Sequence, residues 1–258
     1  MSKSAKVKAA EARNKEAAAQ KKRQRFINLS IFATVTLVVV GIVGGAFVTS
    51  QSNKVADQPN PEAAAPVGTI PAGAKYEYGV KKNDAPDAPV LEIWEDFQCP
   101  ACGAFEVQFG PTINDIAEKN LASVILRSTS FLDTRFPGQN SQRAAGAWGC
   151  AIDQGRGNAF HDAAYSNQPF SEGDGYSKEQ LLDIGRQAGI TGTQYDEFEQ
   201  CVVDKKYLAW AANGTATMIA EGVTGTPTLI LDGEALTDEQ RATPETLLEA
   251  VKAANPQE

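Results

Sequence analysis

The segment Cys99-Pro100-Ala101-Cys102 constrains the fold of this 258-residue chain more than any other. An apolar stretch, residues 89–97 (PVLEIWEDF), comes directly before it and has the composition of a buried β-strand. Residues 103–116, which follow it, can form a helix. The two cysteines are therefore expected at the point where a strand leads into a helix.

This position decides the expected chemistry of the pair. If Cys99 is the helix N-cap, Pro100 occupies the first helical position, where a backbone N–H would have no intrahelical partner. The sulfur of Cys99 then accepts hydrogen bonds from the next N–H groups, and the helix dipole favours an anion there. We expect the pKa of Cys99 to be lowered, so that its thiolate attacks disulfides and Cys102, one turn later, resolves them. The sequence thus predicts dithiol chemistry with unequal partners.

A zinc site is the alternative interpretation of two cysteines at this spacing. Zinc would require a second cysteine pair or a Cys/His cluster. The other cysteines, Cys150 and Cys201, are isolated in the sequence, and His161 is the single histidine. We therefore expect no metal, and dithiol exchange itself needs no bound cofactor.

The N-terminal part of the chain predicts a membrane anchor. Residues 1–25 carry nine Lys or Arg and two Glu, a net charge of +7, and residues 26–53 carry no charge. The apolar segment 26–49 can span a bilayer, which takes a helix of about 20 residues. The basic flank places the N-terminus in the cytoplasm and the rest of the chain outside. The alternative is a cleaved signal peptide, but its apolar core is usually only about 7 to 15 residues long.

The remainder of the chain is acidic. Residues 50–73 contain four prolines among Ala, Gly and polar residues, which is typical of an extended extracytoplasmic linker. Removing the basic tail from the formal net charge of −8 leaves −15 for residues 26–258. A strongly acidic domain without a basic patch argues against nucleic acid as a partner.

Strand and helix patterns alternate after the linker. Residues 75–80, 90–97 and 121–132 have strand character, and the potential helix after Cys102 lies between the last two. This order predicts a βαβ unit and a mostly parallel sheet.

The region 133–207 has helical character throughout. Apolar residues recur at helical spacing in residues 141–153 and 193–208. Residues 177–180 (SKEQ) have the pattern of a capping box before another helix. We expect these helices to form an insertion between two halves of an α/β domain.

The C-terminal part returns to mixed structure. A helix predicted at residues 207–221 ends at Gly222, the residue type favoured after a helix C-cap. Asp232-Gly233 can close a two-residue hairpin, and Thr243-Pro244-Glu245 has the composition of a helix start.

Two segments together resemble a known family. Residues 96–102 (DFQCPAC) are similar to the DFxCPxC signature of DsbA-like thiol-disulfide oxidoreductases, and residues 222–228 (GVTGTPT) are similar to their GVxGTPT segment. The resemblance extends over about residues 89–253 and is strongest to membrane-anchored actinobacterial members. It implies an α/β thioredoxin fold preceded by one transmembrane helix. The fold would comprise residues 74–132, an inserted helical domain at 133–207, and residues 208–258.

The resemblance also implies roles for individual residues. Cys99 would be the exposed nucleophile and Cys102 the buried resolving thiol. A cis Pro227 would lie against the pair, and Thr226 with Pro227 would bind a substrate backbone as an added strand. The most strongly oxidising members have His between the cysteines, whereas Ala101 gives the thiolate neither charge nor hydrogen bond. We therefore expect a milder oxidant.

Cys150 and Cys201 need a separate explanation. In an oxidising compartment, two further cysteines on apolar helix faces are expected to form a structural disulfide, which the actinobacterial relatives also carry. The alternative is two buried free thiols that pack as small apolar side chains. A relay between them and Cys99–Cys102 has no support in the sequence.

Several ionisable residues lie near these features. One of Glu92, Glu95 and Asp96 could accept a proton from Cys102, but alternation does not identify it in a strand that is buried on both faces. His161 and Asp162 suggest a base and its orienting group. No nucleophilic serine motif accompanies them, so His161 is expected at the surface or between helices.

These features predict a single-pass protein of the cell membrane with an extracytoplasmic catalytic domain. It would pass the Cys99–Cys102 disulfide to reduced secreted or cell-envelope proteins. The resemblance implies reoxidation by a quinone-linked membrane partner of the DsbB or vitamin K epoxide reductase type. Two alternatives are a reductase or isomerase of the same fold, kept reduced by a membrane electron donor, and a non-catalytic module that binds unfolded secreted chains.

Overall fold

The computed structural model describes residues 60, 62–136, 138–169, 171 and 173–255. The chain divides into two units, residues 1–54 and 55–258, and every described residue belongs to the second. The predicted cytoplasmic tail, the predicted anchor at residues 26–49 and part of the predicted linker lie outside the described residues. None of the helices in the described part of the chain has the length and apolar character needed to cross a bilayer.

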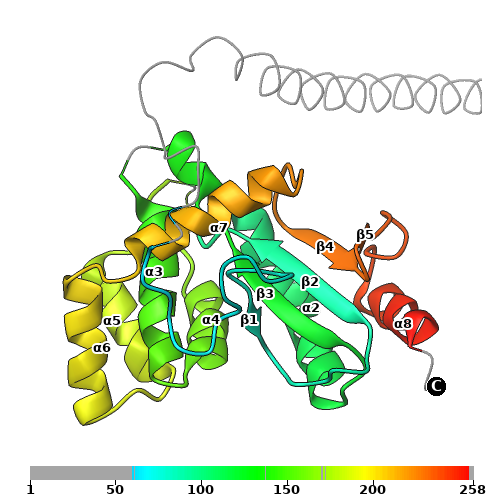
Figure 1. Ribbon diagram of the computed structural model, residues 1–258, viewed down its shortest axis with the longest axis horizontal. Helices are drawn as coiled ribbons and strands as arrows, with labels where there is room; N and C mark the ends of the chain where they lie inside the picture. Colours follow the sequence, from blue (N-terminus) through cyan, green and yellow to red (C-terminus); the bar gives the residue numbers. More distant parts are fainter. Residues whose placement is uncertain (1–59, 61, 137, 170, 172, 256–258) are drawn as a thin grey trace, which may run out of the picture. The chain divides into compact units, whose positions relative to one another are not determined.

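A five-stranded sheet with the order β1-β3-β2-β4-β5 forms the centre of the described unit (Figure 1). Its strands are β1 (Val80–Lys81), β2 (Val90–Glu95), β3 (Ser123–Ser128), β4 (Thr228–Leu231) and β5 (Glu234–Ala235). The β2–β3 pairing is parallel, as the predicted βαβ unit requires, but every other pairing is antiparallel. The prediction of a mostly parallel sheet is therefore wrong.

The direction of β4 explains this difference. The first residue of β4, Thr228, is paired with Trp94 near the end of β2. The chain thus re-enters the sheet at the edge where β2 leaves it, and it runs back along β2 in the opposite direction. As a consequence, the residues just before β4 lie beside the residues just after β2.

Some helices pack on the sheet, and others form a separate group on one side of it. Helix α2 (Pro100–Glu118) contacts β3 and α8 (Pro244–Ala254), and α7 (Leu208–Ala220) also contacts β3. Four helices, α3 (Asn140–Asp153), α4 (Gly157–Ser166), α5 (Lys178–Gln187) and α6 (Thr193–Val203), form the inserted part after the short helix η1 (Phe131–Thr134). Figure 1 shows the inserted helices on one side of the sheet and α8 on the other. Helix α4 joins the two parts because it packs against α2.

Local sequence signals are accurate where they depend on neighbouring residues. Ser177 and Thr243 each cap a helix through a reciprocal capping box, and Gly222 follows α7 with a φ of 74°. Asp232 and Gly233 both have positive φ in the β4–β5 turn. Helix boundaries expected from caps therefore agree with the structure.

Strand lengths agree less well. The strand predicted at residues 75–80 is reduced to Val80–Lys81, and the one predicted at residues 121–132 ends at Ser128. The Thr129 N–H still donates to the Glu95 carbonyl oxygen of β2 at 2.8 Å, but the Ser130 N–H donates to Thr215 Oγ1 of α7 at 2.7 Å, so the chain turns from the sheet to α7 here. Helix α7 approaches closely here, since a Cβ on Gly214 would lie 2.2 Å from the carbonyl oxygen of Ser128.

Candidate active site

The two cysteines lie where β2 passes into α2, as the sequence predicts. Cys99 is the N-cap of α2 with extended backbone angles, and Pro100 occupies the first helical turn. The Cys99 carbonyl oxygen accepts hydrogen bonds from the N–H groups of Cys102 at 3.0 Å and Gly103 at 3.1 Å. Both cysteines are free thiols in the structure.

The pKa of Cys99 is lowered to about 6. Its largest cause is a hydrogen bond from the thiol of Cys102, which burial of Cys99 opposes. The side chain of Thr226 and the N–H groups of Cys102 and Ala101 contribute less. The low pKa agrees with the sequence prediction, and the predicted N–H groups of Ala101 and Cys102 contribute to it, but the largest cause is the Cys102 thiol, which the sequence prediction did not include.

Cys102 has the opposite environment. It is completely buried, and burial raises its pKa well above the ordinary value, with further increases from the hydrogen bond to Cys99 and from the charge of Glu95. Cys99 itself is only 7% exposed, so it is less accessible than expected for an exposed nucleophile. The pair therefore consists of one sulfur that ionises easily and one that holds its proton.

The peptide bond between Thr226 and Pro227 is cis and lies beside the cysteine pair. The Sγ of Cys99 donates a hydrogen bond to the Thr226 carbonyl oxygen at 3.5 Å. The Thr226 hydroxyl is buried and has no hydrogen-bond partner among the described residues. This hydroxyl can turn towards an ionised Cys99, which explains its part in lowering the pKa of Cys99.

Three acidic residues before the pair have three different environments. Asp96 is buried and accepts hydrogen bonds from Ser141 Oγ at 2.5 Å and from the Leu132 N–H at 3.1 Å, so it connects the active-site turn to the insertion. Burial raises the pKa of Asp96 to about 7. Glu92 pairs with Arg127 at 2.7 Å, and Glu95 is the acid whose charge acts on Cys102.

Arg127 links the sheet to the segment that leads to the cis proline. Its guanidinium lies 2.7 Å from Glu92 and 2.6 Å from Glu221, and it stacks over the Trp94 ring at 4.0 Å. Glu221 is the C-cap of α7, directly before the residues that lead to Thr226. Trp94 is thus a core residue, and the ion pair fixes the start of this segment.

Gln168, which follows α4 in the insertion, holds the turn that carries Cys99. Its Nε2 donates to the carbonyl oxygens of Phe97 and Cys99, both at 2.9 Å. A Cβ on Gly103 would lie 2.0 Å from the Gln168 side chain, so glycine at this position permits the approach. No sequence pattern connects Gln168 with residues about 70 positions earlier, and sequence reasoning missed it.

His161 lies in the interior of the described unit, between helices and sheet. It is 2% exposed, and its Nε2 lies 2.9 Å from Glu95 Oε2. The rings of Phe97, Trp148 and Tyr165 surround it. The expectation of an interhelical position agrees with this, and the expectation of a surface position is wrong.

Cys150 of α3 and Cys201 of α6 form a disulfide at a sequence separation of 51. Both helices belong to the insertion, and Cys150 is buried. The alternative of two free thiols does not agree with the structure. This disulfide joins two helices within the insertion and involves neither Cys99 nor Cys102.

The sheet, the cysteine pair at the β2–α2 junction and the neighbouring cis proline define a thioredoxin-like protein. A family model described as thioredoxin matches residues 84–253, and the chain belongs to this family. No curated protein matches the chain.

Solved structures of thiol-disulfide oxidoreductases share this architecture. The MdbA protein of Actinomyces oris is 22% identical, with a TM-score of 0.61 over 78% of this chain and 98% of that one. Reduced DsbA of Mycobacterium tuberculosis is 26% identical, with a TM-score of 0.57 over 68% of this chain and 91% of that one. BdbD of Bacillus subtilis is 18% identical, with a TM-score of 0.57 over 74% and 98%. The predicted resemblance to DsbA-like thiol-disulfide oxidoreductases is thereby confirmed.

Proposed function

We propose that this protein introduces disulfides into secreted or cell-envelope proteins through Cys99 and Cys102. The observation that carries the proposal is the inequality of the two thiols. The pKa of Cys99 is about 6, so at neutral pH its reduced form is mainly a thiolate, whereas Cys102 stays protonated. A stabilised thiolate favours the reduced form of the protein, and this makes its disulfide an oxidant of other thiols.

The exchange follows from these positions. A substrate thiolate attacks Cys99 Sγ in the Cys99–Cys102 disulfide, and Cys102 leaves as a thiolate that takes up a proton. A second substrate thiolate then attacks the substrate sulfur of the mixed disulfide and releases Cys99 as a thiolate. Two electrons pass from the substrate to the protein in each cycle. At a pH above the pKa of Cys99, Cys102 keeps one of the two substrate protons and the other is released to solvent.

Thr226 and Pro227 are the proposed contact for substrate backbone. The Thr226 carbonyl oxygen lies 3.5 Å from Cys99 Sγ, so a peptide extended along this segment would bring its cysteine next to the nucleophile. Main-chain pairing of this kind accepts many sequences because side chains are not part of it. This fits an enzyme with a range of unfolded substrates.

The cellular setting is part of the proposal. The basic residues 1–25 and the apolar segment 26–49 support a signal anchor with the folded unit outside the cytoplasm. Reduced protein must lose two electrons before the next cycle. The resemblance to DsbA-like proteins supports a quinone-linked membrane partner of the DsbB or vitamin K epoxide reductase type as the acceptor.

A trapping experiment tests the proposal. In Cys102→Ala, the mixed disulfide through Cys99 cannot be resolved, so adducts with substrates should accumulate and disappear on reduction. Cys99→Ala/Cys102→Ala is the matched control and should form no adducts through this site. If the single variant forms no more adducts than the control, the exchange mechanism is wrong and a non-catalytic binding module is favoured.

The direction of electron flow needs a second measurement. Ala101 between the cysteines favours a smaller stabilisation of the thiolate, which is the observation that keeps a reductase or isomerase as the second candidate. Equilibration of the full chain with glutathione gives the reduction potential. A value near that of thioredoxin, about −270 mV, would support the reductase, and a value well above it would support the oxidase.

A further inference from the structure

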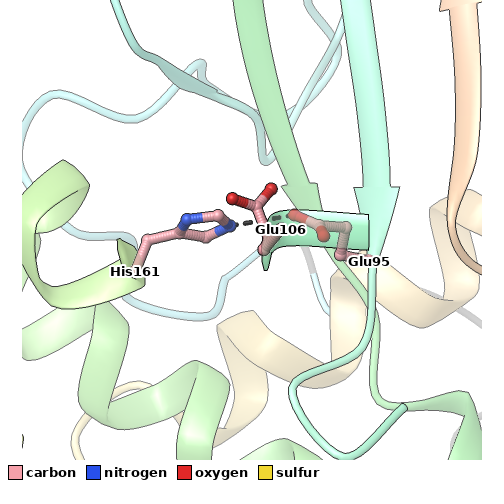
Figure 2. A group of neighbouring side chains, drawn as sticks. All are labelled: Glu95, Glu106 and His161. Atoms are coloured by element: carbon pink, nitrogen blue, oxygen red, sulfur yellow. Dashed lines mark hydrogen bonds and ion pairs between the residues drawn. The ribbon is translucent and has the colours of Figure 1, made fainter. Parts of the chain in front are cut away.

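A cluster of three side chains, the buried Glu95 and His161 and the half-buried Glu106, lies where three elements meet. Glu95 is the last residue of β2, Glu106 comes from α2 and His161 from α4. One oxygen or nitrogen of each lies within 4.8 Å of those of the other two. Figure 2 shows the His161 imidazole and the Glu95 carboxylate facing each other, with the Glu106 side chain beside the hydrogen bond that joins them.

Several polar atoms in and around this cluster are unsatisfied. Glu95 is 3% exposed, and its Oε1 has no hydrogen-bond partner among the described residues; the same holds for Glu106 Oε1 and the Tyr165 hydroxyl. Tyr165 lines the same small void as Glu95 and His161. Buried polar atoms without partners are rare in folded proteins, and an ion bound between these side chains would supply the missing partner.

The imidazole of His161 is oriented as in a metal ligand. Its Nδ1 lies 3.3 Å from Asp162 Oδ1, and Asp162 is in turn paired with Lys82 at 3.2 Å. A proton on Nδ1 donated to Asp162 leaves the lone pair of Nε2 directed at the two glutamates. Carboxylates in this position hold metal-bound histidines in one tautomer and raise their basicity.

We infer that Glu95, Glu106 and His161 bind one divalent transition metal ion. Imidazole nitrogen with carboxylate oxygen is a donor set that suits Zn²⁺, Fe²⁺ and Mn²⁺, and two carboxylates neutralise a dication. Ligand atoms about 2.1 Å from a tetrahedral ion lie about 3.4 Å from one another. Donor atoms that lie within 4.8 Å of one another reach this spacing through rotations of the glutamate side chains.

The proposed metal site contains neither cysteine and does not depend on the proposed function, although the charge of Glu95 acts on Cys102. Its three ligands include neither Cys99 nor Cys102. In the absence of an ion, the proton shared between His161 Nε2 and Glu95 Oε2 occupies the same position. Metal binding therefore replaces this proton with an ion that contacts Glu106 as well.

The test uses the full chain with the Cys99–Cys102 disulfide formed, so that thiols cannot bind the probe. Zn²⁺ is titrated at neutral pH in competition with a chromophoric chelator. We expect one Zn²⁺ per wild-type chain and an affinity reduced at least about 100-fold in Glu106→Gln. Asp162→Asn should reduce the affinity about 10- to 100-fold through the orientation of His161. Glu118→Gln, an exposed carboxylate at the end of the same helix, is the matched control and should bind like wild type.

Equal Zn²⁺ binding by wild type and Glu106→Gln, or no binding by either, would overturn the inference and leave a cluster that holds a proton only. Thermal unfolding gives an independent readout that does not depend on activity. Zn²⁺ should raise the unfolding temperature of wild type and of Glu118→Gln because it binds the folded state. It should leave Glu106→Gln unchanged, and an equal shift in all three proteins would also contradict the site.

Discussion

The molecule contains two cysteine pairs that differ in sequence spacing, in surroundings and in the state of their sulfur atoms. Cys99 and Cys102 are separated by two residues at the end of a strand, are free thiols, and have pKa values shifted in opposite directions. Cys150 and Cys201 are 51 positions apart, come from two helices of the insertion and are joined by a disulfide. The comparison shows that two pairs of the same residue type have different expected roles because their spacing in the sequence and their surroundings differ.

Chain entropy accounts for part of the difference. Closing a loop of 51 residues stabilises the folded state by about 4 kcal/mol in the chain-entropy model, whereas closing the Cys99–Cys102 loop gives only about 2 kcal/mol. The thiolate of Cys99 additionally stabilises the open form of its own pair. The proposed Cys99–Cys102 disulfide is therefore expected to open easily, and the Cys150–Cys201 disulfide is expected to stay closed.

The largest expected effect separates the pairs by activity. Cys99→Ser should reduce disulfide exchange with a reduced model protein to the uncatalysed rate, because serine cannot form the mixed disulfide. Cys150→Ala/Cys201→Ala should retain exchange at a temperature at which it is folded. Oxidative refolding assays measure both. Exchange that survives in Cys99→Ser, or that is lost only in the double variant, would reverse the assignment of the pairs.

The second effect separates the pairs by stability. Removing the long-range disulfide in Cys150→Ala/Cys201→Ala should lower the free energy of unfolding by about 4 kcal/mol, as measured by denaturant titration. Reducing only Cys99–Cys102 at pH 7 should change it much less, because the ionised Cys99 stabilises the folded reduced form. A larger loss on reducing Cys99–Cys102 than in the double variant would contradict this comparison.

The pH dependence of the reduction potential isolates Cys99. Reduction takes up two protons below pH 6 and one above it, so the potential should fall by about 59 mV per pH unit below this point and by about 30 mV above it. The sign follows from the lowered pKa: the thiolate stabilises reduced folded protein fully above pH 9, and this stabilisation is lost as the pH falls through 6. Equilibration with glutathione across this range shows whether the slope changes near pH 6. A constant slope would mean that Cys99 ionises like an ordinary thiol.

A smaller effect tests the Thr226 hydroxyl. Thr226→Val removes this hydroxyl while keeping the shape of the side chain, and the pKa of Cys99 should rise by about 0.5 to 1 unit. The rate of alkylation of reduced protein as a function of pH reports the shift without a substrate in the groove. Thr224→Val, at an exposed position in the same segment, is the control. An unchanged midpoint would assign the low pKa to Cys102 and the backbone alone.

The smallest effect is on stability and concerns the contact between the insertion and the Cys99 turn. The Cys150–Cys201 pair is held within the insertion by a covalent bond, whereas the Cys99 turn is held by hydrogen bonds from Gln168. Gly103→Ala should displace Gln168 and cost stability in the wild-type background. In Gln168→Ala the same change should be neutral or stabilising, because alanine is the better helix former. A double-mutant cycle in denaturant should give a coupling energy of about 1 kcal/mol. Additive effects would mean that Gln168 and Gly103 act independently.

The parts of the structure that the sequence predicts are those set by neighbouring residues. Caps at Ser177 and Thr243, the turn at Asp232-Gly233 and the helix that starts after Cys99 all depend on side chains within a few positions. The resemblance added the cis bond before Pro227, which local sequence does not determine.

The features that were missed depend on contacts between distant segments. The direction of β4 depends on the end of the sheet at which the chain re-enters it after α7. The largest cause of the low pKa of Cys99 is the Cys102 thiol rather than the helix N-terminus. The contact of Gln168 with the Cys99 turn and the burial of His161 follow from how the insertion packs on α2. Periodicity and spacing do not contain this information, because they describe one segment at a time.

The segment between α7 and β4 is anchored at both ends. Arg127 holds Glu221 before it, and Thr228 is paired with Trp94 after it. The backbone around Pro227 is thus already ordered. If a substrate polypeptide aligns with it as proposed, the polypeptide bears nearly the whole entropic cost of association itself. Flexible, unfolded chains would lose this entropy at any of many registers and bind with similar affinity at each. Binding should therefore be weak and short-lived, and release after exchange should be fast.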